Sequence, residues 1–258
     1  MINEDDGFSS PTADDVDVFV TVTEEINGLS VKAVIGEEDM GTAGGREAEL
    51  HVSGSFGTVS VGTVNNAAAA TDEIVDVAAA QGGDANPSHG GDQTSNTIAW
   101  TLPAMVDGLT LIASMGVEAG TDNGVSTDEL ETMSYAVKYT VGSLTGVYSV
   151  IDVEDAAYTT NHASLSYNSN GIFVGVASTS DDGAANTDTQ TAAVKYTMGS
   201  TSFYYEANES DASGTVTETD VMGVGYAVGG GLSVYAEMGE QNTPAATSNT
   251  TVGVKYAF

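Results

Sequence analysis

Carboxylates are the chemically capable side chains that dominate this chain. Its 258 residues include 37 Asp and Glu but only 5 Lys and Arg, which gives a formal net charge of −32. A nucleic-acid binder needs a basic stripe to neutralise phosphates, so we exclude nucleic acid as a partner. Carboxylates at this density can attract cations through a water-filled space, and those in loops can hold divalent cations weakly.

Catalysis finds little support in the residue spacing. His51, His89 and His162 lie far apart, and none has the spacing of a metal site or a catalytic triad. The sequence contains no nucleophile elbow, phosphate loop or dinucleotide fingerprint. The absence of cysteine removes thiolate metal sites and disulfide frameworks. We therefore expect a protein that is not an enzyme and needs no cofactor.

The elements that position the carboxylates are predicted to be strands. Apolar and polar residues alternate with period two along the chain, for example in 16–22 and 29–35, which the Asn27-Gly28 turn joins. The same pattern predicts fifteen strands between residue 15 and the C-terminus. Short turns alternate with longer acidic loops, as is typical of an up-and-down meander. The long loops are expected near 37–45, 119–130, 180–188, 209–216 and 240–248.

The hydropathy pattern excludes a helical membrane protein but not a barrel. No stretch reaches the roughly 18 apolar residues of a spanning helix, and the N-terminus lacks the basic start and apolar run of a signal peptide. Strands of about 9–11 alternating residues are enough to cross a bilayer as a barrel.

The two faces of the predicted strands differ in character. One face is apolar and is assigned outward to Leu29, Val31, Leu50, Val52, Leu109, Leu111, Ile172, Val174, Leu232 and Val234. The other face suits the wall of a water-filled lumen and carries Asp15, Asp17, Lys32, Glu47, Glu49, His51, Glu118, Glu206 and Glu237. A soluble barrel of this strand number would be too wide for side chains to fill.

A repeated tyrosine marks one level of the predicted sheet, beside the short turns. The interval between successive tyrosines is 28, 29, 30 and 30 residues, which corresponds to one hairpin plus one long loop. Aromatic residues at one height on an apolar face predict a girdle at a membrane interface, whereas core packing in a soluble sandwich is the alternative. The predicted girdle comprises Trp100, Tyr139, Tyr167, Tyr196, Tyr226 and Tyr256.

Three motifs resemble the Gram-negative outer-membrane general diffusion porins. The end of the chain, Thr250 to Phe258, is similar to the C-terminal porin strand, whose terminal Phe is the signal for insertion. Ser53 to Gly62 resembles the turn between the third and fourth porin strands. Asn96 to Thr101 resembles the strand that follows the constriction loop. The resemblance covers nearly the whole chain.

This resemblance implies an all-β fold in a single domain, residues 1–258. The expected architecture is a sixteen-stranded transmembrane antiparallel up-and-down β-barrel with short periplasmic turns and long acidic extracellular loops. The porin family also implies a homotrimer in the outer membrane, surrounded by lipid. Small hydrophilic solutes and ions would cross its water-filled channel by passive diffusion.

Strand direction leaves the predicted barrel one strand short. The first visible strand, 15–23, and the last strand both run toward short turns, so they would be parallel neighbours at the seam. An antiparallel barrel with an even number of strands needs one more strand there. We expect this strand and any signal peptide to lie upstream of Met1. The alternative is that residues 1–10 supply it, with Asn3 to Gly7 beginning the first loop.

The longest connection, residues 65–93, corresponds in the resemblance to the constriction loop folded into the lumen. Thr71 is a plausible N-cap for a short helix, because acidic residues in the first turn are favoured by the helix dipole. The candidates for the acidic side of the constriction are Asp72, Glu73, Asp76, Asp84 and Asp92. A solvated acidic loop without a role in the pore is the alternative for each.

General porins often carry an arginine at the position where this chain has Thr63, and basic residues are scarce in the chain as a whole. A lumen lined by carboxylates with few bases focuses a negative potential, which attracts cations. We therefore expect a cation-preferring channel. The alternative is an acidic adhesin-like surface protein, or a structural β-rich protein, without channel activity. The available bases are Lys32, Arg46, Lys138, Lys195 and Lys255.

Overall fold

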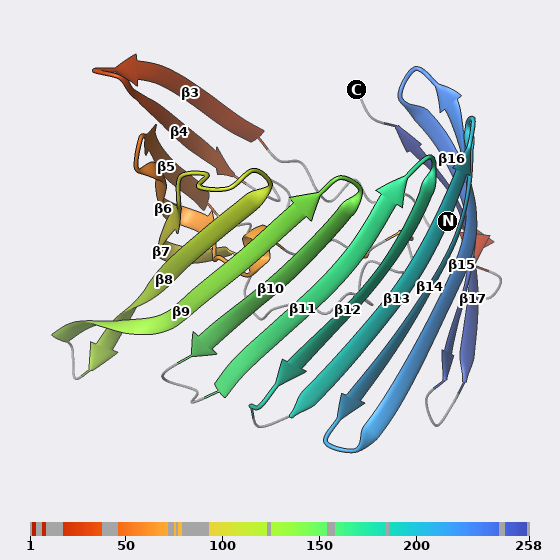
Figure 1. Cartoon of the computed structure of the whole chain (residues 1–258). Helices are drawn as coiled ribbons and strands as arrows, with labels where there is room; N and C mark the ends of the chain where they lie inside the picture. The colour runs from red at the N-terminus through yellow and green to blue at the C-terminus, as the bar shows by residue number, and fades with distance from the viewer. Residues whose placement is uncertain are drawn as a thin grey trace.

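A continuous sheet of fifteen antiparallel strands, β3 to β17, makes up most of the computed structural model (Figure 1). Each strand is hydrogen-bonded to the next one along the chain. The structure describes residues 2–3, 7–8, 18–37, 46–71, 75, 77–78, 93–122, 125–153, 158–183, 186–242 and 246–256. The predicted all-β, up-and-down fold class is confirmed.

The strands follow the predicted alternating segments closely. In chain order they are β3 (Val18–Ile26), β4 (Leu29–Glu37), β5 (Arg46–Gly54), β6 (Gly57–Asn65), β7 (Gln93–Thr101), β8 (Leu109–Asp122), β9 (Val125–Val141), β10 (Leu144–Val153), β11 (Tyr158–Ser169), β12 (Ile172–Asp181), β13 (Thr187–Met198), β14 (Thr201–Ala212), β15 (Thr215–Gly229), β16 (Leu232–Asn242) and β17 (Thr247–Tyr256). One 3₁₀ turn, η1 (Ala69–Thr71), interrupts the connection between β6 and β7. In the part of the chain that is described, no helix has the length and apolarity to cross a membrane.

Two of the connections expected as long acidic loops are instead extended hairpins. β8 and β9 remain paired out to Asp122 and Val125, and β14 and β15 out to Ala212 and Thr215. Thr, Ser and Val in these segments favour strand structure. Carboxylates are tolerated where both faces of the hairpin are in contact with water. The ladder therefore continues through most of 119–130 and 209–216.

The N-terminal residues and the sheet edges bear on the expected extra strand. β1 (Ile2–Asn3) pairs with β2 (Gly7–Phe8) in a separate two-stranded sheet. β3 and β17 are the two edges of the fifteen-stranded sheet. With fifteen antiparallel strands, the two edge strands run in the same direction. The parity noted in the sequence is therefore present in the structure, while the strand expected upstream of Met1 remains a prediction.

Tight turns with positive φ set the strand register on the short-turn side. Asn27 and Gly28 have φ of 53° and 81°, and Asn170 and Gly171 have φ of 52° and 77°. Positive φ at both central residues is the signature of the type I′ turn, which matches the twist of the strands it joins. The Asn-Gly turn predicted at 27–28 is therefore present.

The two faces of the sheet are inverted relative to a soluble protein. On β11, Leu165 is 52% exposed and Tyr167 is 41% exposed, whereas His162 is 3% exposed and Ser166 is 7% exposed. On this strand, apolar side chains thus project from the outer face and polar ones are buried on the inner face. Soluble proteins bury the apolar set instead, so an apolar medium is expected around the outer face.

The band assigned outward from the sequence lies on this outer face. Its members pair across strands with other outward apolar residues or with one another, and none projects to the inner face. The pairs are Leu29 with Ile26, Val31 with Val52, Leu50 with Ala33, Leu109 with Tyr139, Leu111 with Val137, Ile172 with Tyr196, Val174 with Val194, Leu232 with Tyr256, and Val234 with Val254.

Aromatic rings on the inner face lie over glycines of the neighbouring strand. Tyr204 is paired with Gly223, and Tyr235 is paired with Gly253. A Cβ atom added at Gly223 would stand 2.3 Å from Cζ of Tyr204, and one added at Gly253 would stand 2.2 Å from Cζ of Tyr235. Because glycine leaves this space open, each ring rests against the wall rather than projecting away from it.

We predict that Gly223→Ala destabilises the sheet, because its methyl group would overlap the Tyr204 ring. The free energy of unfolding should fall by about 1–3 kcal/mol, as is typical of overpacking. Urea unfolding in lipid vesicles would measure it. Gly146→Ala on β10 is the control, since the nearest neighbour of its Cβ would be Cδ1 of Leu165 at 3.8 Å. Equal effects of the two substitutions would contradict the packing explanation.

Candidate functional site

The segment after β6 is held on the inner face of the sheet by serine hydroxyls. The backbone N–H of Ala67 donates to Oγ of Ser114 on β8 at 2.9 Å, and the N–H of Ala68 donates to Oγ of Ser134 on β9 at 3.0 Å. Ala67 and Ala68 are fully buried. Ala68 packs with Ile151 and Val153 of β10. This segment therefore crosses three strands of the inner wall in a defined position.

The cap of the short turn η1 is Asn66. Oδ1 of Asn66 accepts the N–H of Ala69 at 2.9 Å, as an N-cap side chain does. Thr71 is the last residue of η1, and its hydroxyl donates back to the carbonyl of Ala68 at 2.8 Å. Asn66 thus satisfies the first free amide of η1. The helix predicted to begin after Thr71 falls on residues outside the described part of the chain, so that assignment stays a prediction.

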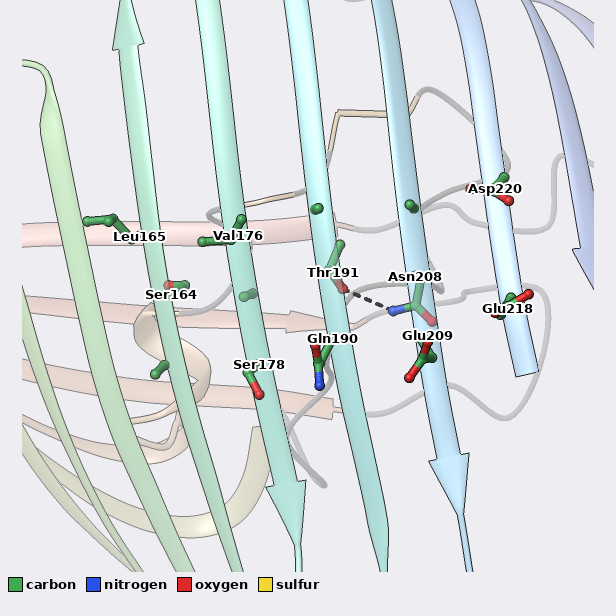
Figure 2. A pocket seen from close by; sticks show the side chains of 14 residues that line it. Ser164, Leu165, Val176, Ser178, Gln190, Thr191, Asn208, Glu209, Glu218 and Asp220 are labelled. Carbon is green, nitrogen blue, oxygen red and sulfur yellow. Dashed lines mark hydrogen bonds between the residues drawn. The ribbon is translucent and has the colours of Figure 1, made fainter. Parts of the chain in front are cut away.

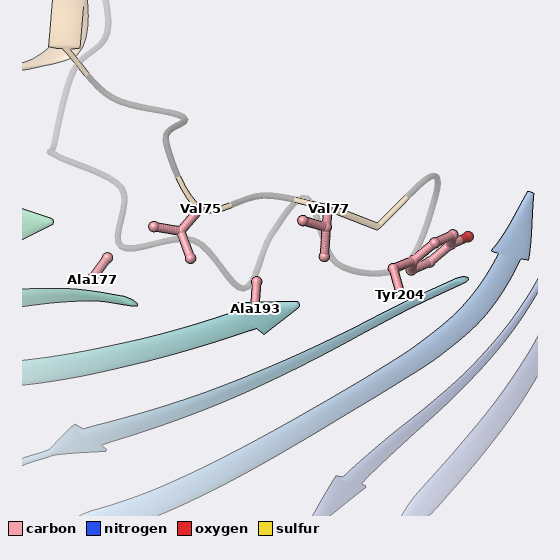
Figure 3. Packing of buried hydrophobic residues seen from close by; sticks show 5 residues of the cluster. All are labelled: Val75, Val77, Ala177, Ala193 and Tyr204. Atoms are coloured by element: carbon pink, nitrogen blue, oxygen red, sulfur yellow. The ribbon is translucent and has the colours of Figure 1, made fainter. Parts of the chain in front are cut away.

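Further along the same segment, two valines pack against the wall on β12 to β14. Val75 and Val77 form a buried cluster with Ala177, Ala193 and Tyr204. Figure 3 shows both valine side chains directed toward the strands that carry the other three residues. Because Ala177 and Ala193 are small, the segment can approach the wall closely there.

Two glutamates lie beneath this segment and are almost completely buried. Glu206 on β14 and Glu237 on β16 are each 1% exposed. Oε2 of Glu206 accepts the backbone N–H of Val77 at 3.0 Å, and Oε1 of Glu237 accepts the hydroxyl of Tyr204 at 2.7 Å. Buried carboxylates require such donors. Both predicted wall residues thus lie on the inner face, and Glu206 holds the segment in place.

The inner face of β4 to β6 carries a polar cluster that is open to solvent in part. Nε2 of His51 lies 2.8 Å from Oε2 of Glu49, and Nδ1 lies 2.7 Å from Oγ of Ser60. The side chains of His51 and Glu49 are 21% and 17% exposed. Lys32 is paired directly with His51 across the β4–β5 ladder and is exposed. Among the residues described, no group of three or more His, Asp or Glu could hold a metal ion.

Several predicted site residues fall outside what the structure describes. The acidic candidates of the long connection belong to this group, as do the first two wall residues and the terminal signal: Asp72, Glu73, Asp76, Asp84, Asp92, Asp15, Asp17 and Phe258. Glu47 and Glu118 lie in β5 and β8, but their side chains are outside the described part.

The residues predicted for the aromatic girdle project from the outer face beside the short connections. Their exposed fractions lie between 41% and 58%. The indole Nε1 of Trp100 donates to the carbonyl of Phe56 at 2.9 Å, which ties β7 to the β5–β6 turn. The register places Tyr139 opposite Leu109, Tyr167 opposite Leu144, Tyr196 opposite Ile172, Tyr226 opposite Thr201, and Tyr256 opposite Leu232.

A groove of about 720 Å³ crosses β11 to β15 (Figure 2). Most of the side chains that line it are outward ones, among them Leu165 and Val176 at one end and Glu209 and Glu218 at the other. Because these side chains alternate with the buried inner set, the groove belongs to the outer face. It is therefore separate from the polar inner face.

Ser114, Ser134 and Asn66 are the positioning residues that sequence reasoning missed. Period two places both serines on the inner face of their strands, but the strand pattern carries no signal of which segment they contact. Asn66 precedes an alanine run, and an Asn before a helix-forming run is an N-cap signal that could have been read.

Comparison with known proteins identifies the family. The family model for Gram-negative porins matches residues 3–246, nearly the whole chain. The chain therefore belongs to the Gram-negative porin family. Among curated protein sequences, no match was found.

Solved porin structures share the fold at low sequence identity. A triple mutant of the Rhodopseudomonas blastica porin is 20% identical with a TM-score of 0.75, covering 95% of this chain and 90% of that one. An anion-selective porin from Comamonas acidovorans is 15% identical with a TM-score of 0.71, covering 94% and 89%. The protein is thus an outer-membrane porin, and its fold is a multi-pass transmembrane β-barrel.

We predict that Ser114→Ala/Ser134→Ala loosens the segment held on the inner face, because two backbone amides lose their acceptors. Each hydrogen bond contributes about 1 kcal/mol, so amide exchange over residues 66–71 should accelerate by roughly tenfold or more. Peptide-resolved hydrogen exchange in detergent would measure it. Ser53→Ala is the control, because the hydroxyl of Ser53 bonds to Thr58. Unchanged exchange in the double variant would contradict the anchoring role.

Proposed function

We propose that this porin forms a water-filled, cation-preferring channel for passive diffusion of ions and small hydrophilic solutes. The observation that carries the proposal is the ratio of 37 Asp and Glu to 5 Lys and Arg. A pore through such a protein has a negative potential, which concentrates cations and excludes anions. The anion-selective porin among the similar structures has the same fold, so charge rather than fold must set the preference.

The inner face alone is nearly balanced in charge. The register places four lysines and five carboxylates inward among the described side chains: Lys32, Lys138, Lys195 and Lys255, and Glu25, Glu49, Asp181, Glu206 and Glu237. All four lysines lie toward the short-turn side of the sheet: Lys32, Lys138 and Lys195 are four residues from Gly28, Gly142 and Gly199, and Lys255 is paired with Ser233, two residues after Gly231. The preference would therefore come mainly from the connection after β6.

We propose that residues 65–93 act as the constriction loop. In support, residues 66–71, 75 and 77 lie against the inner wall of β8 to β14, where a narrowing of the lumen would form. Its carboxylates would then face the open wall of β4 to β6, where Lys32 stands. The channel would need no cofactor, the exposed tyrosines and Trp100 would form the interfacial girdle, and the assembly would be a homotrimer.

The expected result of a bilayer experiment is a potassium-over-chloride preference. With purified protein in a planar bilayer and a tenfold KCl gradient, the reversal potential should have the sign for cation permeation. The preference should weaken as the salt concentration rises, because ions screen the carboxylates. A reversal potential that indicates anion preference would overturn the cation proposal while leaving the channel intact.

The loop carboxylates are tested by neutralising three of them. The variant Asp72→Asn/Glu73→Gln/Asp76→Asn should lower the potassium-to-chloride permeability ratio by about twofold or more. The control is Asp188→Asn/Glu209→Gln/Glu218→Gln, which removes an equal number of negative charges from exposed outward positions on β13, β14 and β15. Equal reductions in both variants would indicate a general surface potential and would contradict a constriction role for this loop.

A further inference from the structure

The wall of β4 to β6 holds a histidine whose charge can change without a change in its contacts. In the neutral ring of His51, Nε2–H donates to Oε2 of Glu49 and Nδ1 accepts from the hydroxyl of Ser60. In the protonated ring both nitrogens donate, and the hydroxyl of Ser60 rotates to become an acceptor. Both hydrogen bonds survive in either state, so no rearrangement opposes protonation.

Few other charges face this histidine. Glu49 lies two residues away on β5, and Lys32 lies directly opposite on β4. The remaining inward neighbours on the two adjoining strands are uncharged: Ser30, Val34, Thr58, Ser60 and Gly62. A single proton on His51 is therefore a large fraction of the local charge.

The charge count of this wall shows how much one proton changes. Among the described inward side chains of β3 to β6, Glu25 and Glu49 contribute −2 and Lys32 contributes +1, so the sum is −1 with a neutral ring. Protonation of His51 raises the sum to zero. Histidine is the side-chain type that gains a proton between about pH 8 and pH 5.

A second histidine provides an internal contrast. His162 on β11 also lies on the inner face, but it is 3% exposed and its Nδ1 lies 3.0 Å from Oγ1 of Thr179. His51, at 21% exposure, is open to solvent and ions on the inner face. Comparing the two residues therefore distinguishes the effect of an ion-accessible histidine from that of a buried one in the same protein.

We propose that His51 is a specificity-determining residue of the channel, whose protonation weakens the preference for cations. The inference rests on the proposed channel function and deepens it. The proton adds a positive charge beside Lys32 on the wall of β4 to β6, and this charge repels cations and attracts anions. The preference should therefore be strong at pH 8 and weaker at pH 5.5.

The test compares reversal potentials at pH 8.0 and 5.5 for the wild-type protein, His51→Gln and His162→Gln in planar bilayers. For the wild type and His162→Gln, the potassium-to-chloride permeability ratio should fall by about twofold to fivefold between the two pH values, as expected for one added unit charge beside a water-filled path. For His51→Gln the ratio should change much less, because glutamine keeps polar contacts but does not titrate.

The outcomes separate this inference from the proposed function. A wild-type ratio that does not change with pH, or a change that persists in His51→Gln, would overturn the role of His51 while the channel stands. Loss of the change in His162→Gln alone would also overturn it. Absence of any conductance in the refolded wild-type protein would overturn the channel itself. Heat-dependent gel migration of each variant shows that the barrel is folded in every arm.

Discussion

Pairing of backbone N–H and C=O groups across neighbouring strands is the interaction on which the rest of this protein depends. The hydrocarbon interior of a membrane supplies no water to satisfy these groups, so they must be paired within the protein. The continuous ladder from β3 to β17 does this for the strands between its two edges. Because strands have period two, the ladder also sorts every side chain to one of two faces. The apolar outer face and polar inner face follow from that single constraint.

The inner face then positions a segment that has no ladder of its own. Backbone amides of Ala67, Ala68 and Val77 donate to side chains from β8, β9 and β14, which lie far apart in the sequence. An amide held against a wall needs an acceptor, and a buried carboxylate needs donors. The hydrogen bond from Val77 to Oε2 of Glu206 contributes to both needs at once. Glu206 therefore holds the segment against the wall. Without this contact, its carboxylate would contribute to the electrostatic potential of the lumen.

Burial of some carboxylates changes how the net charge of −32 should be understood. Exposed charges on the outer ends of the hairpins act on the pore less than charges beside the ion path, since water and salt screen them over about a Debye length. The small number of charged groups on the open wall makes each one influential. The cluster of Glu49, His51 and Ser60 belongs to this open wall, and its hydrogen bonds keep the imidazole in one orientation.

The sequence by itself determined the strands, their faces and the family, because period-two alternation and Asn-Gly turns are local patterns with a direct backbone cause. Val31 and Val52 could be placed outward, and Glu49 and His51 inward, from that pattern alone. Only the tertiary structure decided that Glu206 is buried under Val77 and that Ser60 completes the contacts of His51. These contacts join residues from 9 to 129 positions apart. Local patterns do not specify such pairs, because they depend on how the whole sheet curves and which segment it brings against its inner face.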